Sequence, residues 1–214
     1  AFGTARPGGP LANALDVRMK NLANTSVLSW GGRLLALYEA DVPCRLDEDL
    51  AFAGADCLGG LLKPGLAAST GVELVDGLLG MGGRAFTAHP KMDPQRRSLV
   101  GFRWSSKDGG VELRFHEWDE DFRSLQPADG VVVPLPDCDA QPHDFGLTPK
   151  RYVFIENRLK MGDVSGFLLG AKGAVQCLES QPHEPQRIHV VPRPGPGGAV
   201  EGERVILEGS TSAF

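Results

Sequence analysis

The chain has 214 residues, of which 42% are hydrophobic, so it is long enough and apolar enough to build a sizeable core. Its 22 basic and 27 acidic residues give a net charge of −5, which leaves no basic footprint for nucleic acid and argues against nucleic acid as a partner. Its 28 glycines and 16 prolines leave little room for long helices. The composition therefore predicts short strands joined by tight turns.

The cysteines and the apolar runs exclude two further classes. Cys44, Cys57, Cys138 and Cys177 include no C-x-x-C pair, which argues against zinc ribbons and thioredoxin-like sites and predicts reduced, partly buried thiols. The longest apolar runs, such as Leu34–Tyr38, are far shorter than the roughly 20 residues that cross a bilayer. No membrane-spanning helix is predicted.

The first third of the chain carries a hairpin signal followed by a long glycine- and leucine-rich segment. The apolar runs Val27–Trp30 and Arg33–Glu39 flank a Gly-Gly pair, the pattern of two strands joined by a tight turn. Asp41–Leu50 is predicted to be a short strand that ends in an acidic turn. Residues 51–83 have weak periodicity and are interpreted as a long functional loop.

The remainder of the chain predicts further short strands. Apolar and polar side chains alternate along Val111–Trp118, which indicates a strand with one buried face and places His116 on the solvated face. Other strand-like runs are Phe86–His89, Leu99–Trp104, Val131–Val133, Tyr152–Glu156, Ala174–Leu178, Arg187–Val191 and Arg204–Leu207. Many short strands at near-regular spacing predict an all-β sandwich, barrel or propeller, and periodicity does not choose among them.

Two proline-bounded histidines are the candidate metal ligands. His89 precedes a proline and His143 follows one, each at the edge of a strand-like run, and only the fold could bring them together. An imidazole binds a metal through a neutral nitrogen while its other N–H is held by an acceptor. Asp144 follows His143 directly, so in an extended segment it points to the opposite face, which argues against a two-histidine-one-carboxylate site built from this pair. Ordinary core or turn histidines are the alternative.

Other chemistries have weaker support. His183 lies in a proline-bounded turn and is predicted to be solvated, whereas His189 is interpreted as a structural strand residue. Gly80–Gly83 lacks the last glycine of a dinucleotide fingerprint, and there is no Walker loop or nucleophile elbow. Asp119–Asp121 is typical of an exposed turn rather than of an acid/base pair.

Four ordered segments resemble the carotenoid cleavage oxygenases, the family that includes stilbene-cleaving dioxygenases and the retinal pigment epithelium isomerase. They are Asn24–Glu39 (an early strand pair), Phe86–Pro94 (the first ligand motif), Pro142–Thr148 (the second) and Pro185–Arg193 (the stretch before the third). The family fold is a seven-bladed β-propeller. The resemblance therefore implies that residues 24–214 form an incomplete propeller with a long loop at 51–83, preceded by an irregular segment at 1–23.

The resemblance also implies a metal centre. His89 and His143 would be two of four histidines that bind Fe(II), and Glu39 matches a glutamate that accepts an N–H from a ligand histidine. Four neutral ligands leave the metal its full charge and open positions for dioxygen, consistent with cleavage of a conjugated C=C bond into two carbonyls. The third ligand motif is expected directly after Phe214, so these 214 residues are expected to belong to a longer protein.

The main hypothesis is a non-haem Fe(II) dioxygenase that cleaves a carotenoid, apocarotenoid or stilbene-like polyene with dioxygen. The alternative is an inactive truncated propeller that serves as a structural or pigment-associated subunit of a larger assembly. A third reading is a β-domain that binds an apolar ligand without metal. Leucines of residues 51–83, together with Gly166–Leu169, suggest peripheral membrane contact, with ordinary core leucines as the alternative. The polyene substrate favours a plastid over the cytoplasm.

Overall fold

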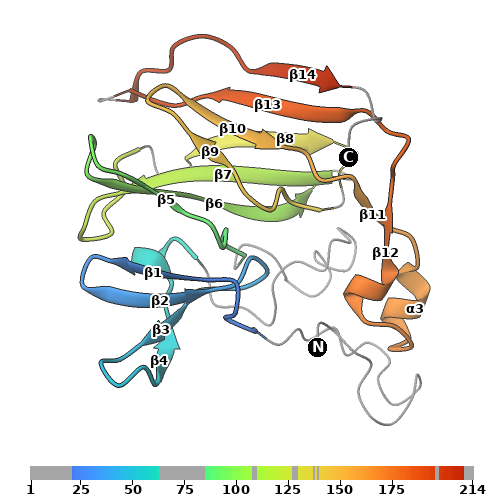
Figure 1. Ribbon diagram of the computed structural model, residues 1–214, viewed down its shortest axis with the longest axis horizontal. Helices are drawn as coiled ribbons and strands as arrows, with labels where there is room; N and C mark the ends of the chain where they lie inside the picture. The colour runs from blue at the N-terminus through green and yellow to red at the C-terminus, as the bar shows by residue number, and fades with distance from the viewer. Residues whose placement is uncertain are drawn as a thin grey trace.

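The fold is nearly all β, as the composition predicts (Figure 1). The computed structural model describes residues 21–62, 85–107, 110–126, 130–136, 138, 140–195 and 198–209. Within this part of the chain the strands form three four-stranded antiparallel sheets and one two-stranded antiparallel sheet. All four cysteines are free thiols.

The first sheet is a meander of four neighbouring strands. These are β1 (Ser26–Trp30), β2 (Arg33–Leu37), β3 (Cys44–Leu46) and β4 (Phe52–Ala55). The predicted hairpin is confirmed: Gly31 and Gly32 have φ of +55° and +68°, which a tight two-residue turn between antiparallel strands requires. A Cβ on Gly31 would lie 2.2 Å from the carbonyl oxygen of Glu120, so this turn also needs glycine for space.

The prediction of a long loop at residues 51–83 is wrong for residues 52–60. Strand β4 and the short 3₁₀ helix η1 (Leu58–Gly60) lie there, and residues 63–84 fall outside the described part. Leu58 and Leu62 are buried, and Leu61 packs against the same core cluster. These three leucines are therefore core residues rather than a membrane patch. Membrane contact through Gly166–Leu169 and through the leucines of residues 63–84, which lie outside the described part, stays a prediction.

The second sheet lies between the other two. Its strands are β5 (Lys91–Asp93), β6 (Ser98–Lys107), β7 (Gly110–Trp118) and β8 (Val131–Pro136). The prediction of one solvated face on β7 is wrong, because both faces are packed and His116 is only 1% exposed. Leu113 and Phe115 join the cluster shared with the third sheet, whereas Trp118 joins the cluster shared with the first.

The third sheet carries an insertion between its second and third strands. The sheet contains β9 (Gly146–Leu147), β10 (Arg151–Ile155), β13 (Gln186–Pro192) and β14 (Val205–Gly209). The insertion contains β11 (Leu159–Met161), α3 (Val164–Leu168), η2 (Ala174–Cys177) and β12 (Leu178–Ser180). The strand predicted at Ala174–Leu178 is therefore wrong, since a 3₁₀ turn precedes β12. No described helix is long and apolar enough to cross a membrane.

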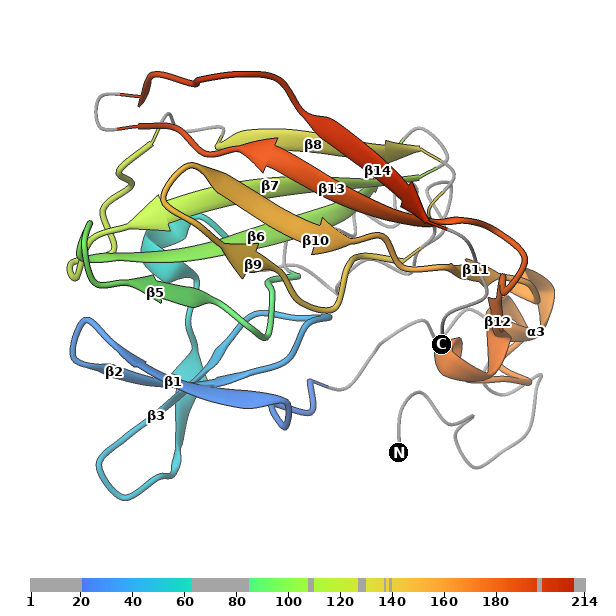
Figure 2. The ribbon, with the colours of Figure 1, turned by 45° about the horizontal axis from the view of Figure 1, so that its top comes forward.

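The three sheets follow one another in chain order across the molecule, from β1–β4 to the sheet that ends in β14 (Figure 2). A repeated four-stranded antiparallel meander is the blade of a β-propeller. The expected fold, part of a β-propeller, is confirmed.

A buried ionic network joins the second and third sheets. Arg193, just after β13, places its Nε 2.7 Å from Oε1 of Glu117 and another guanidinium nitrogen 2.6 Å from Oδ2 of Asp93. The hydroxyl of Tyr152 donates to the same Glu117 oxygen at 2.8 Å. Burial alone would lower the pKa of Arg193, but its hydrogen bonds to the two carboxylates raise it. The network fixes β5, β7 and β13 relative to one another.

Candidate metal centre

The two motif histidines meet in the folded chain. His89 lies just before β5 and His143 just before β9, so each precedes the first strand of its sheet. Their Nε2 atoms are 3.1 Å apart, and the rings are inclined at 70° with centroids 4.6 Å apart. Packing of one sheet on the next therefore brings together two residues that are far apart in sequence.

The backbone before His89 is held on the second sheet by a few local contacts rather than by a full strand. Phe86 forms an isolated bridge with Arg103, and the N–H of His89 donates to Oγ1 of Thr87 at 3.1 Å. Phe86 is buried over Gly101, where a Cβ would lie 2.5 Å from the phenyl ring. These contacts place His89 at the edge of the core with its ring outside it.

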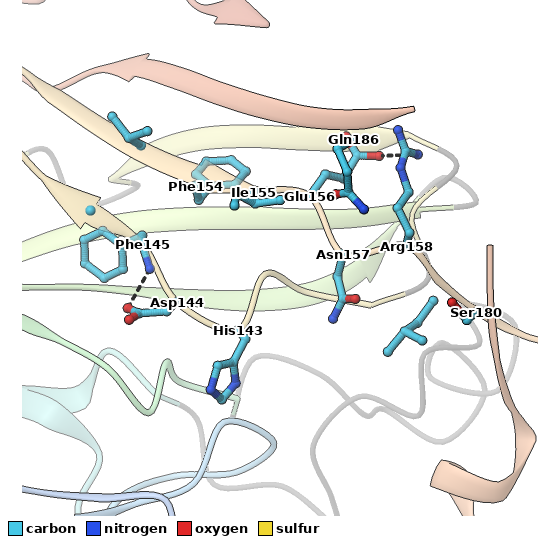
Figure 3. Close-up of a pocket in the computed structure, with 13 residues that line it drawn as sticks. His143, Asp144, Phe145, Phe154, Ile155, Glu156, Asn157, Arg158, Ser180 and Gln186 are labelled. Carbon is cyan, nitrogen blue, oxygen red and sulfur yellow. Dashed lines mark hydrogen bonds and ion pairs between the residues drawn. The ribbon is translucent and has the colours of Figure 1, made fainter. Parts of the chain in front are cut away.

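His143 is placed by the residues on either side of it. Pro142 is buried, and Phe145 packs in the aromatic cluster with its ring centroid 5.3 Å from that of Phe115. The His143 ring itself is exposed and points away from this cluster (Figure 3). Asp144 points in another direction from His143, and its carboxylate accepts the N–H of Phe145 at 2.6 Å.

Glu39 supports His143 from the turn that follows β2. Its Oε2 lies 2.8 Å from Nδ1 of His143. A carboxylate accepts hydrogen bonds, so Nδ1 carries the proton and Nε2 of a neutral ring keeps its lone pair, directed at His89. The backbone carbonyl of Glu39 accepts the indole N–H of the buried Trp104 at 2.8 Å. The second sheet thereby anchors the residue that orients His143.

The spacing of the two rings fits a shared metal. Two nitrogens that each lie about 2.1 Å from one metal ion are roughly 3.0 to 3.4 Å apart for octahedral or tetrahedral angles. The observed 3.1 Å falls in that range. Among the described residues no group of three or more metal-binding side chains occurs, so this part of the chain offers two ligands.

The remaining histidines lie elsewhere. His116 was expected in solvent but is buried, with its ring 5.7 Å from that of Trp118, while His183 is exposed as predicted. His189 is a buried residue of β13 whose Nε2 is 2.8 Å from Glu156. Burial alone would raise the pKa of Glu156, but the hydrogen bond to His189 and the nearby arginines lower it.

An open groove begins at His143. Its volume is about 810 Å³, within the range of small-molecule sites. Apolar side chains such as Phe154 and Ile155 line it, and Asn157 and Arg158 stand at the far end (Figure 3). The groove offers an apolar surface of ligand size that leads to the histidine pair.

Comparison with known proteins identifies the family. The family model described as retinal pigment epithelial membrane protein matches residues 1–211. The chain belongs to the carotenoid cleavage oxygenases. It is 32% identical to apocarotenoid-15,15'-oxygenase of Synechocystis sp. over 201 residues, which cover 91% of this chain and 36% of that protein. It is 31% identical to the chloroplastic carotenoid cleavage dioxygenase 7 of Oryza sativa subsp. japonica, covering 82% of this chain and 33% of that protein.

Solved structures agree with this assignment. A cobalt-substituted Synechocystis ACO superposes with a TM-score of 0.77 and 30% identity, covering 98% of this chain and 39% of its own. The chain thus spans about a third of the length of the curated carotenoid oxygenases it matches.

Sequence reasoning does not find two residues near the metal centre that contact Glu39 and Asp144. Trp104 is one, although a buried tryptophan needs an acceptor for its indole N–H and so signals a specific partner. Lys91 is the other, and its ion pair with Asp144 at 2.8 Å joins the two histidine motifs. No pattern within either motif reveals that contact.

Proposed function

We propose that the chain is part of a longer Fe(II) dioxygenase that cleaves a conjugated C=C bond of a carotenoid or apocarotenoid. The observation that carries the proposal is the convergence of His89 and His143 at 3.1 Å, with Glu39 on the outer nitrogen of His143. The names of the relatives, an apocarotenoid oxygenase and a carotenoid cleavage dioxygenase, support the substrate class. The chloroplastic label of the rice relative supports a plastid location.

Each residue of the centre has a part in this proposal. His89 and His143 would hold the iron as neutral ligands, which leaves the ion its full positive charge. Glu39 fixes the ring orientation and tautomer of His143 and keeps its Nε2 free of a proton. The groove would hold an extended polyene by contact with its apolar side chains, such as Phe154 and Ile155. When bound, Fe(II) supplies the activation of dioxygen.

The test uses the full native polypeptide that contains this segment. We expect about one iron per chain, and aldehyde products when the protein is incubated in air with an apocarotenal. Removal of the metal by a chelator should abolish product formation, and Fe(II) should restore it. Iron-free protein that still cleaves the polyene at full rate would overturn the metal centre. Protein that carries neither iron nor activity would favour the structural-subunit alternative.

Glu39 provides a second, finer prediction. Glu39→Gln removes the charge that faces Nδ1 of His143 and should weaken metal binding by about tenfold, the lower end for residues that orient a ligand. The measurement is a metal titration of the metal-depleted protein. Glu208→Gln is the control, because Glu208 also forms an ion pair at 2.8 Å, with Arg187, but on β14. Equal affinities for Glu39→Gln and the wild type would contradict the role given to Glu39.

A further inference from the structure

An ion pair that touches neither imidazole joins the two histidine segments. Lys91 lies two residues after His89, and Asp144 directly follows His143. The Nζ of Lys91 is 2.8 Å from Oδ1 of Asp144. The contact therefore spans the first residues of the second sheet and the turn that leads into the third.

Both partners are held in place by their own segments. Lys91 is paired in β5, with Val100 of β6 as its partner across the ladder. Oδ1 of Asp144 also accepts the N–H of Phe145 at 2.6 Å, and Phe145 is buried in the aromatic cluster. The Lys91 ammonium lies over that same phenyl ring, 5.7 Å from its centroid. Lys91 thus contacts a carboxylate and a ring that both belong to the His143 segment.

Glu39 cannot perform the same task. It lies in the turn after β2 of the first sheet and orients the His143 ring through Nδ1, on the side away from His89. The distance between the rings depends on how the second and third sheets approach each other at this point. Lys91 and Asp144 form their ion pair across that boundary, two residues after His89 and one residue after His143, respectively.

We propose that Lys91 and Asp144 are positioning residues that set the spacing of the His89 and His143 nitrogens and so the affinity and geometry of the metal. This inference rests on the proposed metal centre. The pair also gives Asp144 a partner away from the rings and balances its charge. The Asp144 carboxylate is therefore engaged by Lys91 and by the N–H of Phe145.

The size of the effect separates positioning from simple stabilisation. The side chains of Lys91 and Asp144 are 32% and 48% exposed, and pairs of this kind add little to folding stability. Metal sites, however, require ligand placement to within about 0.5 Å. We therefore expect Lys91→Met and Asp144→Asn each to weaken metal binding roughly threefold to tenfold, with melting temperatures close to that of the wild type.

The experiment is a Co²⁺ titration of the metal-depleted full polypeptide, followed by the visible absorption of the bound ion. The two single variants should bind more weakly and show shifted absorption bands, and the double variant should bind no more weakly than the weaker single variant, because the residues act as a pair. Lys91→Arg keeps the positive charge, so its Co²⁺ affinity and absorption spectrum should match those of the wild type. A change in the spectrum reports ligand geometry, which a loss of stability alone would not alter.

Lys172→Met is the matched control. Lys172 pairs with Asp163 at 2.6 Å, and the two side chains are 49% and 32% exposed, in the insertion of the third sheet. If Lys91→Met binds Co²⁺ as tightly as Lys172→Met and the wild type, with an unchanged spectrum, the positioning role is overturned. The proposed metal centre is not affected by that result. Wild-type protein that does not bind Co²⁺ would overturn the centre itself. Should Lys91→Met fail to fold, the nearly isosteric Asp144→Asn decides in its place.

Discussion

His143→Ala should remove metal from the full polypeptide and lower the rate of polyene cleavage by more than about a hundredfold. A residue that only orients a ligand costs ten- to a hundredfold when it is replaced, and loss of the ligand itself should exceed that range. The variant also leaves Glu39 without the ring N–H that its carboxylate accepts at 2.8 Å. Metal content and product formation, measured on the same preparation, check the result.

His89→Ala should have the same effect, because the two Nε2 atoms lie 3.1 Å apart and would share one ion. His183→Ala is the control, since His183 is exposed in a turn before β13 and should leave metal content and turnover unchanged. A His143→Ala protein that keeps its metal and its activity would show that the ligands lie elsewhere in the full chain.

Arg193→Met should lower the free energy of unfolding by about 3 to 5 kcal/mol, the cost of breaking a buried ion pair by removing one partner. The Arg193 side chain is 0% exposed and that of Glu117 is 2% exposed, so the substitution leaves Glu117 buried without its main counter-charge. Asp93 loses its partner at 2.6 Å as well. Denaturant unfolding of the full polypeptide, followed by tryptophan fluorescence, gives the measurement.

The control for this loss is Arg97→Met. Arg97 pairs with Glu120 at 3.2 Å, but the two side chains are 77% and 58% exposed, so the expected change is below about 1 kcal/mol. A further variant, Arg193→Met with Glu117→Leu, should regain part of the stability, because it removes a buried charge together with its partner. An Arg193→Met protein as stable as Arg97→Met would contradict the structural role of the network.

The same network bears on the metal centre. It fixes β5 and β13, and β5 begins two residues after His89. Arg193→Met should therefore also weaken metal binding, through the relative position of the second and third sheets rather than through any contact with a ring.

Local patterns account for the elements that were predicted well. The Gly31-Gly32 turn is encoded by the φ angles that only glycine adopts easily, and the alternation along Val111–Trp118 is the period of a strand. His89 and His143 were singled out by their proline-bounded positions and by the family resemblance.

Two of the wrong predictions, for His116 and for the leucines at 58–62, have the same cause, which is packing between sheets. His116 was placed in solvent because polar residues alternate with apolar ones, yet β7 is covered on both faces by the neighbouring sheets. The leucines at 58–62 were assigned to a loop because their periodicity is weak, but their burial comes from contact with Trp118 and Phe86 in a shared cluster. The local sequence around β7 or around residues 58–62 does not show which distant residues pack against it.

Chemistry within a few residues accounts for the all-β class, the short strands and the tight turns, whereas His89 and His143 stand out as candidate ligands through their motifs and the family resemblance. The tertiary structure alone decided that His89 and His143 meet, that Glu39 reaches His143 from the turn after β2, and that Lys91 pairs with Asp144. These contacts join residues far apart in the chain, and their distances depend on how whole sheets pack together.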